Sequence, residues 1–528
     1  MPLSARIRKN LYKDSVTLMR VAQAVLARPG VRRATLLMGT PANKDILAAA
    51  QLDAAALADA GPSDVMIAVE ADTAAALDAA QAEIEQLLEG QRPEVSAGSS
   101  RSHPACSIAL AHARDREAVL AQISVPGPYA AAEALKALRL GLDVFLFSDN
   151  VPIAQERALK ELARDKGLLV MGPDCGTAIL DGVPIGFANV VRRGPISLVG
   201  ASGTGLQEVT CRIHALGSGV RHAIGTGGRD LSEEVGGITM CQAIDLLARD
   251  DATRVVVLVS KPPAPATARK VLSRVAAAGK PCVVLFLGAD PQTLALAPCI
   301  VPVGTLADAA ATAVALVDDR RREPALPFDE ARAGEEASRL ARGQRYVRAL
   351  YSGGTFCTEA QILWRAAGLR VHSNAPLDAA AALPDGGASR DNTALDLGAD
   401  EFTLGRPHPM IDPTLRIERI AQEARDPATA AIVLDVVLGY GAHDDPAGAL
   451  APVIVQAKDA CAREGRHLAV IAFVCGTDDD PQSLTRQRAQ LDAAGALVLP
   501  DSTAAARFAA ALARHAALRR PAAALAQG

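Results

Sequence analysis

The sequence predicts an α/β fold built from doubly wound parallel sheets. Short apolar runs such as ATLLMG, DVFLFSD, ISLVG, VVVLVS and CVVLFLG recur along the chain and alternate with alanine-rich stretches that suit helices. Runs this short between helices are typical of parallel strands that helices cover on both faces. The length of 528 residues exceeds what one hydrophobic core holds and indicates about two to four domains.

Composition narrows the classes of function. The chain has 55 Lys and Arg against 59 Asp and Glu, so it offers no basic surface for nucleic acid. No apolar run approaches the roughly 20 residues of a membrane helix, and the amino-terminal stretch lacks the apolar core of a secretory signal. Nine scattered cysteines without a CxxC pair indicate neither a disulfide framework nor a zinc site. We therefore expect a cytoplasmic protein without metal ligands, nucleic acid or membrane as partners.

Three sequence motifs occur twice in the same order. ISLVGASGTGLQEV is echoed by RALYSGGTFCTEA, LARDDATRVVVLVS by EARDPATAAIVLDV, and VVLFLGADPQT by VIAFVCGTDDDPQS. The order predicts two copies of one α/β domain, at residues 194–318 and 345–515. Between them, the dense mixed charge of residues 319–344 predicts a linker. A solvated surface helix inside one domain fits that composition nearly as well.

The glycine-rich turn of each copy stands where a strand passes into a helix. The first N–H groups of a helix have no partner within it and carry partial positive charge, so small residues there let an anion approach closely. Two such ends facing each other would hold one phosphoryl group from opposite sides. The alternative is that the glycines serve only tight packing. The candidates are Ser202, Gly203, Thr204 and Gly205 in the first copy and Gly353, Gly354 and Thr355 in the second.

Longer motifs carry a family resemblance. LLVMGPDCGTAI, ISLVGASGTGLQEV and IGTGGRDLSEEVGG resemble the α subunit of succinyl-CoA synthetase, an NDP-forming acyl-CoA ligase. The stretch from LYSGGTFCTEA to LDVVLGYGAHDDPAG resembles the carboxy-terminal ligase domain of that enzyme's β subunit. With MGTPANK, FSDN, VSKPP and GRPHPMIDPTLR added, the chain is similar to the FdrA family. The resemblance implies a Rossmann-like domain of the CoA-binding type at 1–190 and two flavodoxin-like domains of the succinyl-CoA synthetase type.

The resemblance also implies roles for individual residues. In the ligases two opposed helix N-termini form the phosphate site, which corresponds to the two glycine-rich turns. Gly227 and Gly228 match the adjacent glycine-rich loop, and Asp174 and Cys175 match the stretch that closes the first domain. Cys175 is a candidate nucleophile, but no base is identifiable, so a buried thiol is favoured. The residues that would contact CoA, and that equally suit ordinary turns, are Gly39, Thr40, Asn43 and Lys44.

Three departures from the ligases change the expected chemistry. Residues 281–317, where the phosphohistidine should lie, contain no His, and no ATP-grasp domain fits in the remaining chain. Lys261 follows the VVVLV strand where an acidic residue is expected. At the carboxyl end of a strand, where α/β sheets bind ligands, Lys261 would bind phosphate oxygens as a point charge. The alternative is a surface lysine before a Pro-Pro turn.

A second candidate cluster lies in the loop GRPHPMIDP. Its prolines exclude a regular helix. Arg406 and His408 together suit a general acid or base, or a clamp for an oxyanion. Hydrogen bonding that merely orders the loop is equally consistent with these residues.

These features predict a subunit of an acyl- or carbamoyl-phosphate transferase that binds phosphate without bonding to it covalently. Similarity to FdrA proteins implies partner subunits and the exchange of a carbamoyl group between oxalurate or oxamate and phosphate, in allantoin breakdown. CoA, and Mg²⁺ accompanying a phosphate substrate, are the cofactors that this interpretation admits. One alternative is a CoA-dependent acyl-CoA synthetase that needs a separate nucleotide-binding subunit. The other is a non-catalytic scaffold that binds metabolites.

Overall fold

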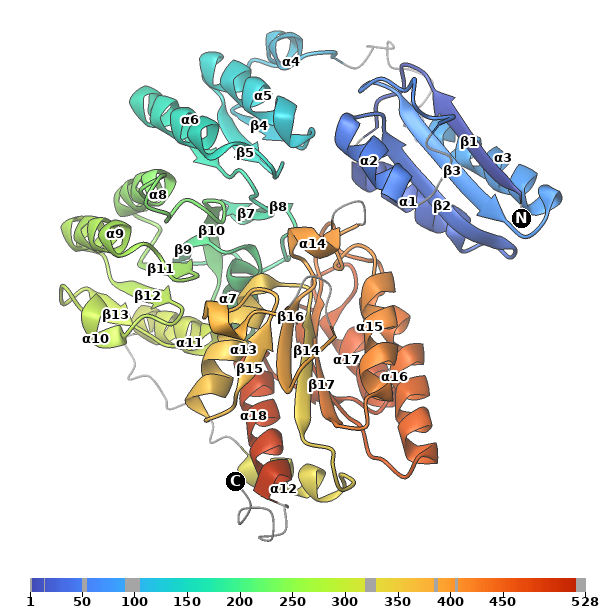
Figure 1. Ribbon diagram of the computed structural model, residues 1–528. Coiled ribbons are helices and arrows are strands. Elements are labelled where there is room, and N and C mark those ends of the chain that lie inside the picture. Colours follow the sequence, from blue (N-terminus) through green and yellow to red (C-terminus); the bar gives the residue numbers. More distant parts are fainter. Residues whose placement is uncertain are drawn as a thin grey trace. The chain divides into compact units, whose positions relative to one another are not determined.

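The computed structural model describes residues 2–13, 15–49, 55–90, 105–318, 329–383, 388–403 and 407–518 (Figure 1). The chain divides into two compact units. The first consists of residues 1–106 together with 403–407, and the second of residues 107–402 together with 408–528.

The first unit contains an antiparallel sheet. Its strand order is β1-β3-β2, and β3 pairs antiparallel with both neighbours. Helices α1 and α3 pack against each other and share a core with the sheet that includes Leu18, Val25, Val69 and Ile84. The elements are β1 Leu3–Arg8, α1 Ser15–Leu26, β2 Val31–Met38, α2 Pro41–Ala49, β3 Val65–Ala71 and α3 Ala74–Gly90.

This sheet differs from the Rossmann-like domain expected over residues 1–190. The apolar runs in this range are strands, but they belong to more than one sheet. The expectation is wrong because an apolar run predicts only that a strand is buried. The direction of that strand and the strands it pairs with depend on residues far away in the chain.

A small parallel sheet, β4-β5-β6, begins the second unit. A β7–β8 hairpin follows it and joins the next sheet, where β7 pairs antiparallel with β10. The elements are α4 Ile108–Arg114, β4 Leu120–Ile123, α5 Gly127–Arg139, β5 Asp143–Leu146, α6 Ile153–Lys166, β6 Val170–Met171, β7 Thr177–Leu180 and β8 Val183–Gly186.

The first ligase-type half is a seven-stranded sheet that includes this hairpin. Its order is β13-β12-β11-β9-β10-β7-β8, and the five strands from β13 to β10 run parallel. Its elements are β9 Ile196–Ala201, α7 Gly203–Ala215, β10 Val220–Gly225, α8 Ile238–Arg249, β11 Val255–Ser260, α9 Pro265–Ala278, β12 Cys282–Phe286, α10 Pro291–Leu294, β13 Ile300–Pro302 and α11 Leu306–Val317.

The second half is a six-stranded parallel sheet in the order β15-β16-β14-β17-β18-β19. Both halves therefore have the predicted α/β architecture with parallel strands. The elements are β14 Tyr346–Tyr351, α13 Gly354–Ala366, β15 Val371–Ser373, the 3-10 turn Ala379–Ala381, β16 Asn392–Asp396, α14 Asp400–Thr403, α15 Thr414–Arg425, β17 Thr429–Val437, α16 Pro446–Arg463, β18 Ala469–Cys475, α17 Leu484–Ala493, β19 Leu497–Leu499 and α18 Ser502–Leu518.

The two halves share one hydrophobic core. Helices α7 and α11 of the first half contact each other, as do α13 and α18 of the second, and α7 also packs on α13 and α11 on α18. One cluster of buried residues runs through this layer, from Leu206 and Ala310 to Phe356 and Leu512. The ligase-type halves thus form one body, which fixes the ends of α7 and α13 relative to each other.

The segment expected to be a linker is partly helical. Helix α12, Glu330–Ser338, packs on α18, and Glu336 pairs with His467 through an Oε1–Nε2 contact of 2.5 Å. Residues 319–328 of that segment lie outside the described part of the chain. Part of the charged segment is therefore the exposed face of helix α12, which packs on α18. In the described ranges no helix is both long and apolar enough to cross a membrane.

Candidate functional site

The N-termini of α7 and α13 meet within the second unit. Ser202 is the N-cap of α7, and its Oγ accepts a hydrogen bond from the N–H of Gly205 at 3.2 Å. The same Oγ lies 2.5 Å from Oγ1 of Thr355 in the first turn of α13. Both hydroxyls are buried. The structure thus brings together the two glycine-rich turns, which lie about 150 residues apart in the chain.

Glycine is required at this junction for close approach. A methyl group at Gly353 would lie 2.6 Å from the side chain of Thr204, and one at Gly205 would collide with Oγ of Ser202. Gly353 is the N-cap of α13, and no side chain caps that helix. The packing explanation for these glycines therefore holds, and the close packing leaves α13 without a side-chain cap.

Several N–H groups remain for a ligand at this junction. Among the described residues, no acceptor bonds the backbone N–H of Gly203, Thr204 or Gly354. Such groups at two converging helix ends favour an anion. This geometry is compatible with a phosphoryl group beside the Ser202–Thr355 contact.

Two side chains of opposite charge stand at the first turn of α13. A methyl group at Gly354 would lie 2.8 Å from Nζ of Lys261 and would collide with Oδ2 of Asp396. Lys261 is exposed and follows β11, whereas Asp396 ends β16 and is 7% exposed. Burial raises the pKa of Asp396, and the positive charge of Lys261 opposes that rise. The lysine therefore has an acidic neighbour that sequence reasoning missed.

Asp174 lies near enough to Lys261 for their charges to interact. Its side chain is reached by solvent but is densely surrounded by protein, and this crowding raises its pKa to about 6. The carboxylates of Asp149 and Asp400 add to that rise, while Lys261 and Arg229 oppose it. A methyl group added at Gly228 would lie 3.5 Å from Oδ2 of Asp174. Asp174 therefore titrates near neutral pH beside the candidate anion site.

The neighbouring Cys175 is a buried thiol. Burial raises its pKa to about 12, and its Sγ lies 3.5 Å from the carbonyl oxygen of Thr177. A thiol with this pKa is protonated at neutral pH and is a poor nucleophile. Its surroundings thus agree with the structural alternative considered for this residue.

His408 lies close to the second helix end as a neutral imidazole. Burial lowers its pKa to about 4, and its Nδ1 accepts a hydrogen bond from the N–H of Met410 at 3.2 Å. The proton is consequently on Nε2, which points at Gly398, two residues beyond Asp396. Its ring also packs near Phe187, with centroids 6.3 Å apart. Arg406, its predicted companion, lies outside the described residues.

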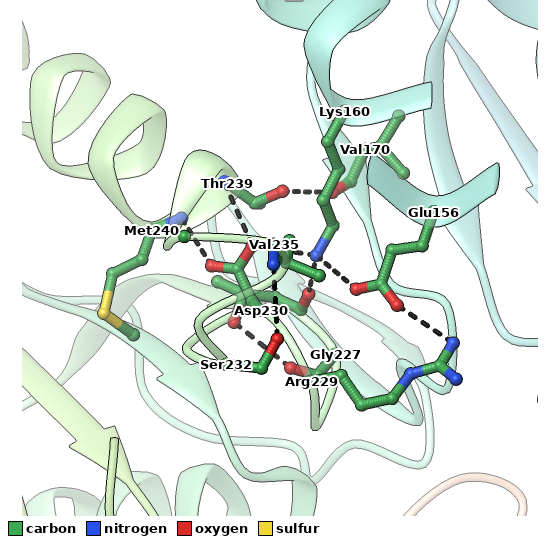
Figure 2. Close-up of polar contacts among 12 residues, drawn as sticks. Glu156, Lys160, Val170, Gly227, Arg229, Asp230, Ser232, Val235, Thr239 and Met240 are labelled. Carbon is green, nitrogen blue, oxygen red and sulfur yellow. Dashed lines mark hydrogen bonds and ion pairs between the residues drawn. The ribbon is translucent and has the colours of Figure 1, made fainter. Parts of the chain in front are cut away.

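A buried ionic network holds the loop that carries Gly227 and Gly228 (Figure 2). Nζ of Lys160, on α6, lies 2.8 Å from Asp230, 2.9 Å from Glu156 and 2.9 Å from the carbonyl oxygen of Thr226. Lys160 and Asp230 are fully buried. Asp230 also accepts from the N–H groups of Thr239 and Met240 at the start of α8. The network fixes the loop between β10 and α8 on both sides.

A second network supports the turn before α13. Asp435, at 0% exposure, accepts from the N–H of Ser352 at 2.9 Å and from the guanidinium of Arg416 at 3.0 Å. Arg416 also donates to the carbonyl oxygens of Leu350 and Asp435. Because Ser352 directly precedes Gly353, this network fixes the backbone at the helix end.

The proposed CoA contacts form a separate group in the first unit. Thr40 Oγ1 accepts from the N–H of Asn43, Asn43 donates to the carbonyl of Met38, and Lys44 donates to that of Ala58. These side chains serve the turn after β2, where Gly39 closely approaches Gly61. Their hydrogen bonds are those of the ordinary turn considered for these residues.

Sequence reasoning missed Asp396, Asp435, Arg416 and Lys160. Asp396 and Asp435 stand at the carboxyl ends of strands, the place that drew attention to Lys261, so that signal was available for them. Lys160 and Arg416 lie on helices and show no local pattern. The described residues contain no group of three or more His, Cys, Asp or Glu side chains placed to hold a metal ion.

Family models match three parts of the chain. The CoA-ligase model matches residues 350–512, and the CoA-binding domain model matches residues 192–288. The model of the AllF heavy metal-associated domain matches residues 1–104. The CoA-binding similarity therefore falls on the first ligase-type half, whereas we expected it in residues 1–190. The matched residues 1–104 contain no Cys and a single His, His103, so this stretch has no thiolate donor for a soft metal ion.

Comparison with individual proteins extends over the whole chain. The uncharacterized protein YahF of Escherichia coli (strain K12) is 44% identical over 511 residues, which cover 95% of this chain and 97% of YahF. The α subunit of ADP-forming succinate–CoA ligase from Aquifex aeolicus (strain VF5) is 25% identical over 182 residues, 33% of this chain and 58% of that subunit. An ATP citrate lyase from Methanothrix soehngenii covers 80% of this chain and 88% of its own at 13% identity, with a TM-score of 0.35. By its match to YahF over nearly the full length of both proteins, the chain belongs to the YahF family, and it contains CoA-binding and CoA-ligase domains.

Proposed function

We propose that this chain is the acyl-transfer component of an acid–thiol ligase-type enzyme. It binds an acyl phosphate at the ends of α7 and α13 and moves the acyl group between phosphate and the thiol of CoA. The observation that carries the proposal is the convergence of two helix N-termini through the 2.5 Å Ser202–Thr355 contact, with Lys261 beside them. The match of CoA-binding and CoA-ligase models to the two halves supports the same assignment.

The arrangement suits a phosphate that is bound but not covalently carried. Unpaired N–H groups and an exposed ammonium stabilise the charge that develops on a departing phosphate. Residues 281–317 contain no His, and His408 has its Nδ1 occupied and its pKa lowered to about 4. We therefore expect the acyl group to arrive already activated, or a partner subunit with a nucleotide site to activate it.

A second candidate is the transfer of a carbamoyl group, as the similarity to FdrA proteins implies. A carbamoyl phosphate presents the same phosphate to the helix ends and the same carbonyl carbon to a nucleophile. The observation that favours it is Lys261 at the position where the ligases are expected to have an acid. The accepting nucleophile is then the amide nitrogen of a small carboxylate such as oxamate, in place of a thiol.

One assay separates these functions. The full chain, alone and with co-purified partners, is incubated with ³²P-labelled acetyl phosphate plus CoA, and in parallel with labelled carbamoyl phosphate plus oxamate. The proposal predicts thioester formation with release of inorganic phosphate and no label on the denatured protein. Carbamoyl transfer without thioester formation would favour the second candidate. Covalent label that survives denaturation would contradict the proposal, because the phosphate would then be carried on the protein. No turnover with either pair would contradict it as well and would leave a metabolite-binding scaffold.

A further inference from the structure

The inference concerns Asp396 and rests on the proposed function. Asp396 is the last residue of β16, and both of its backbone polar groups are hydrogen-bonded to the side chain of Asn374. Its N–H donates to Oδ1 of Asn374 at 2.9 Å, and its carbonyl oxygen accepts from Nδ2 of Asn374 at 3.0 Å. Its Oδ1 accepts from the N–H of Gly398 at 3.1 Å. These contacts fix the carboxyl group in position, and the residue as a whole is 7% exposed.

The other carboxyl oxygen points at the candidate phosphate site. Oδ2 lies beside Gly354, the first residue of α13, and Nζ of Lys261 lies beside the same residue. No donor in the described ranges hydrogen-bonds to Oδ2. A carboxyl oxygen without a hydrogen-bond donor beside a helix end is available to accept a proton or to contact a ligand.

A permanent carboxylate at this place would oppose an anion. It would compete for the same N–H groups at α13 and repel the phosphate oxygens. A carboxyl group that takes up a proton during the reaction avoids this conflict. Burial raises the pKa of Asp396, as do the charges of Asp435 and Glu401, while Lys261 and the N–H of Gly398 lower it. The thiol of Cys357, itself buried with a pKa of about 12, is uncharged beside it.

We infer that Asp396 is the proton acceptor for the nucleophile that attacks the acyl phosphate. In the forward step the thiol sulfur bonds to the carbonyl carbon, and the thiol proton moves to Oδ2 of Asp396. The bond between that carbon and the bridging phosphate oxygen breaks, and its electron pair leaves with the phosphate. The helix N–H groups and Lys261 stabilise the departing phosphate, and Asp396, now neutral, no longer repels it. In the reverse direction Asp396 returns the proton to sulfur.

The test compares D396N with wild type in the thioester assay across pH. We expect D396N to lower kcat by roughly 10²–10⁴-fold and to abolish the acidic limb of its pH profile. The variant should bind sulfate, which does not titrate in this range, at least as tightly as wild type because a negative charge is gone. The matched control is D251N, at an exposed carboxylate in the turn after α8, which should leave kcat and the profile unchanged.

A second variant separates a chemical role from a structural one. D396A should be inactive and regain turnover when formate is added, since the small acid can occupy the space left by the side chain. Wild-type turnover together with an unchanged kcat and pH profile in D396N would overturn the inference and leave the proposed function standing. If D396N is unstable, absence of formate rescue in a folded D396A would overturn it equally. Absence of transfer by wild type overturns both proposals.

Discussion

The two ligase-type halves share one pattern of buried contacts between them, but they differ in the side chains behind the converging helix ends. Their repeated motifs place Glu208 of α7 opposite Glu359 of α13, and each Glu caps a helix of the other half. Glu208 accepts from the N–H of Ser502, the first residue of α18, at 3.1 Å. Glu359 accepts from the N–H of Leu306, the first residue of α11, at 2.9 Å. These crossed caps tie the halves together, and they show that the internal repeat extends to buried polar contacts.

The halves differ directly behind the two converging helix ends. By the repeated motifs, Ser352 and Asp435 stand where the first half has Ala201 and Val259. Arg416 on α15 likewise stands where α8 has Met240. All six side chains are buried, yet one trio is apolar and the other is an ionic network. The comparison teaches that the fold does not require the network, so its place next to Gly353 and Asp396 points to the site.

The largest expected effect comes from breaking that network. R416M leaves the carboxylate of Asp435 buried without its cation, and we expect a loss of about 3–5 kcal/mol in unfolding free energy. The triple variant S352A/D435V/R416M copies the apolar trio of the first half and should recover most of that loss. Urea denaturation of both proteins measures the difference. A triple variant as unstable as R416M would show that the two halves are not interchangeable here.

The loop of the first half offers a related test. Lys160 neutralises Glu156 and Asp230 beneath the Gly227–Gly228 loop, and Arg229 also pairs with Glu156 at 2.9 Å (Figure 2). K160M should therefore cost about 3 kcal/mol, because Asp230 alone loses its cation. Hydrogen exchange should then rise in residues 226–240 and stay unchanged around α13. Uniform destabilisation without local opening would contradict the role assigned to this network.

The crossed caps predict a pH dependence. Burial, with the charge of Asp501, raises the pKa of Glu208 to about 8 from its ordinary value of 4.5. The folded state then binds the proton more tightly than the unfolded state, so stability falls as pH rises from 4.5 to 8. E208Q mimics the protonated form, so it should match wild type near pH 4.5 and exceed it by on the order of a few kcal/mol at pH 8.5. Equal Tm differences at both pH values would argue against a protonated Glu208.

The smallest effect concerns the two helix caps. Ser202 caps α7 through its side chain, whereas Gly353 leaves α13 uncapped. S202A should cost about 1 kcal/mol. G353S should not stabilise the protein, because its added atoms would meet Thr204 at 2.6 Å. A stabilising G353S in thermal unfolding would show that the junction has more room than the structure gives it.

Much of this architecture is predictable from the sequence. Apolar runs between helices give the parallel α/β halves, and the repeated motifs give both glycine-rich turns and both glutamates. The antiparallel sheet of the first unit is not predictable in this way, since Leu3–Arg8 and Val65–Ala71 pair across some 60 residues. The roles of Asp396 and of the Ser352–Asp435–Arg416 network are not predictable for the same reason, because their partners lie on other elements. Local patterns identify the strand ends, whereas only the packed structure shows which ends meet.

The central claim is that the ends of α7 and α13, with Lys261, bind phosphate. Isothermal titration of the full chain with inorganic phosphate tests it most directly, using K261A and the control K166A, an exposed lysine in the last turn of α6. We predict one saturable site in wild type and K166A, and about tenfold weaker binding in K261A, equivalent to about 1.4 kcal/mol. K261A should unfold at the same temperature as wild type. No saturable binding by wild type, or equal affinity in K261A, would contradict the claim.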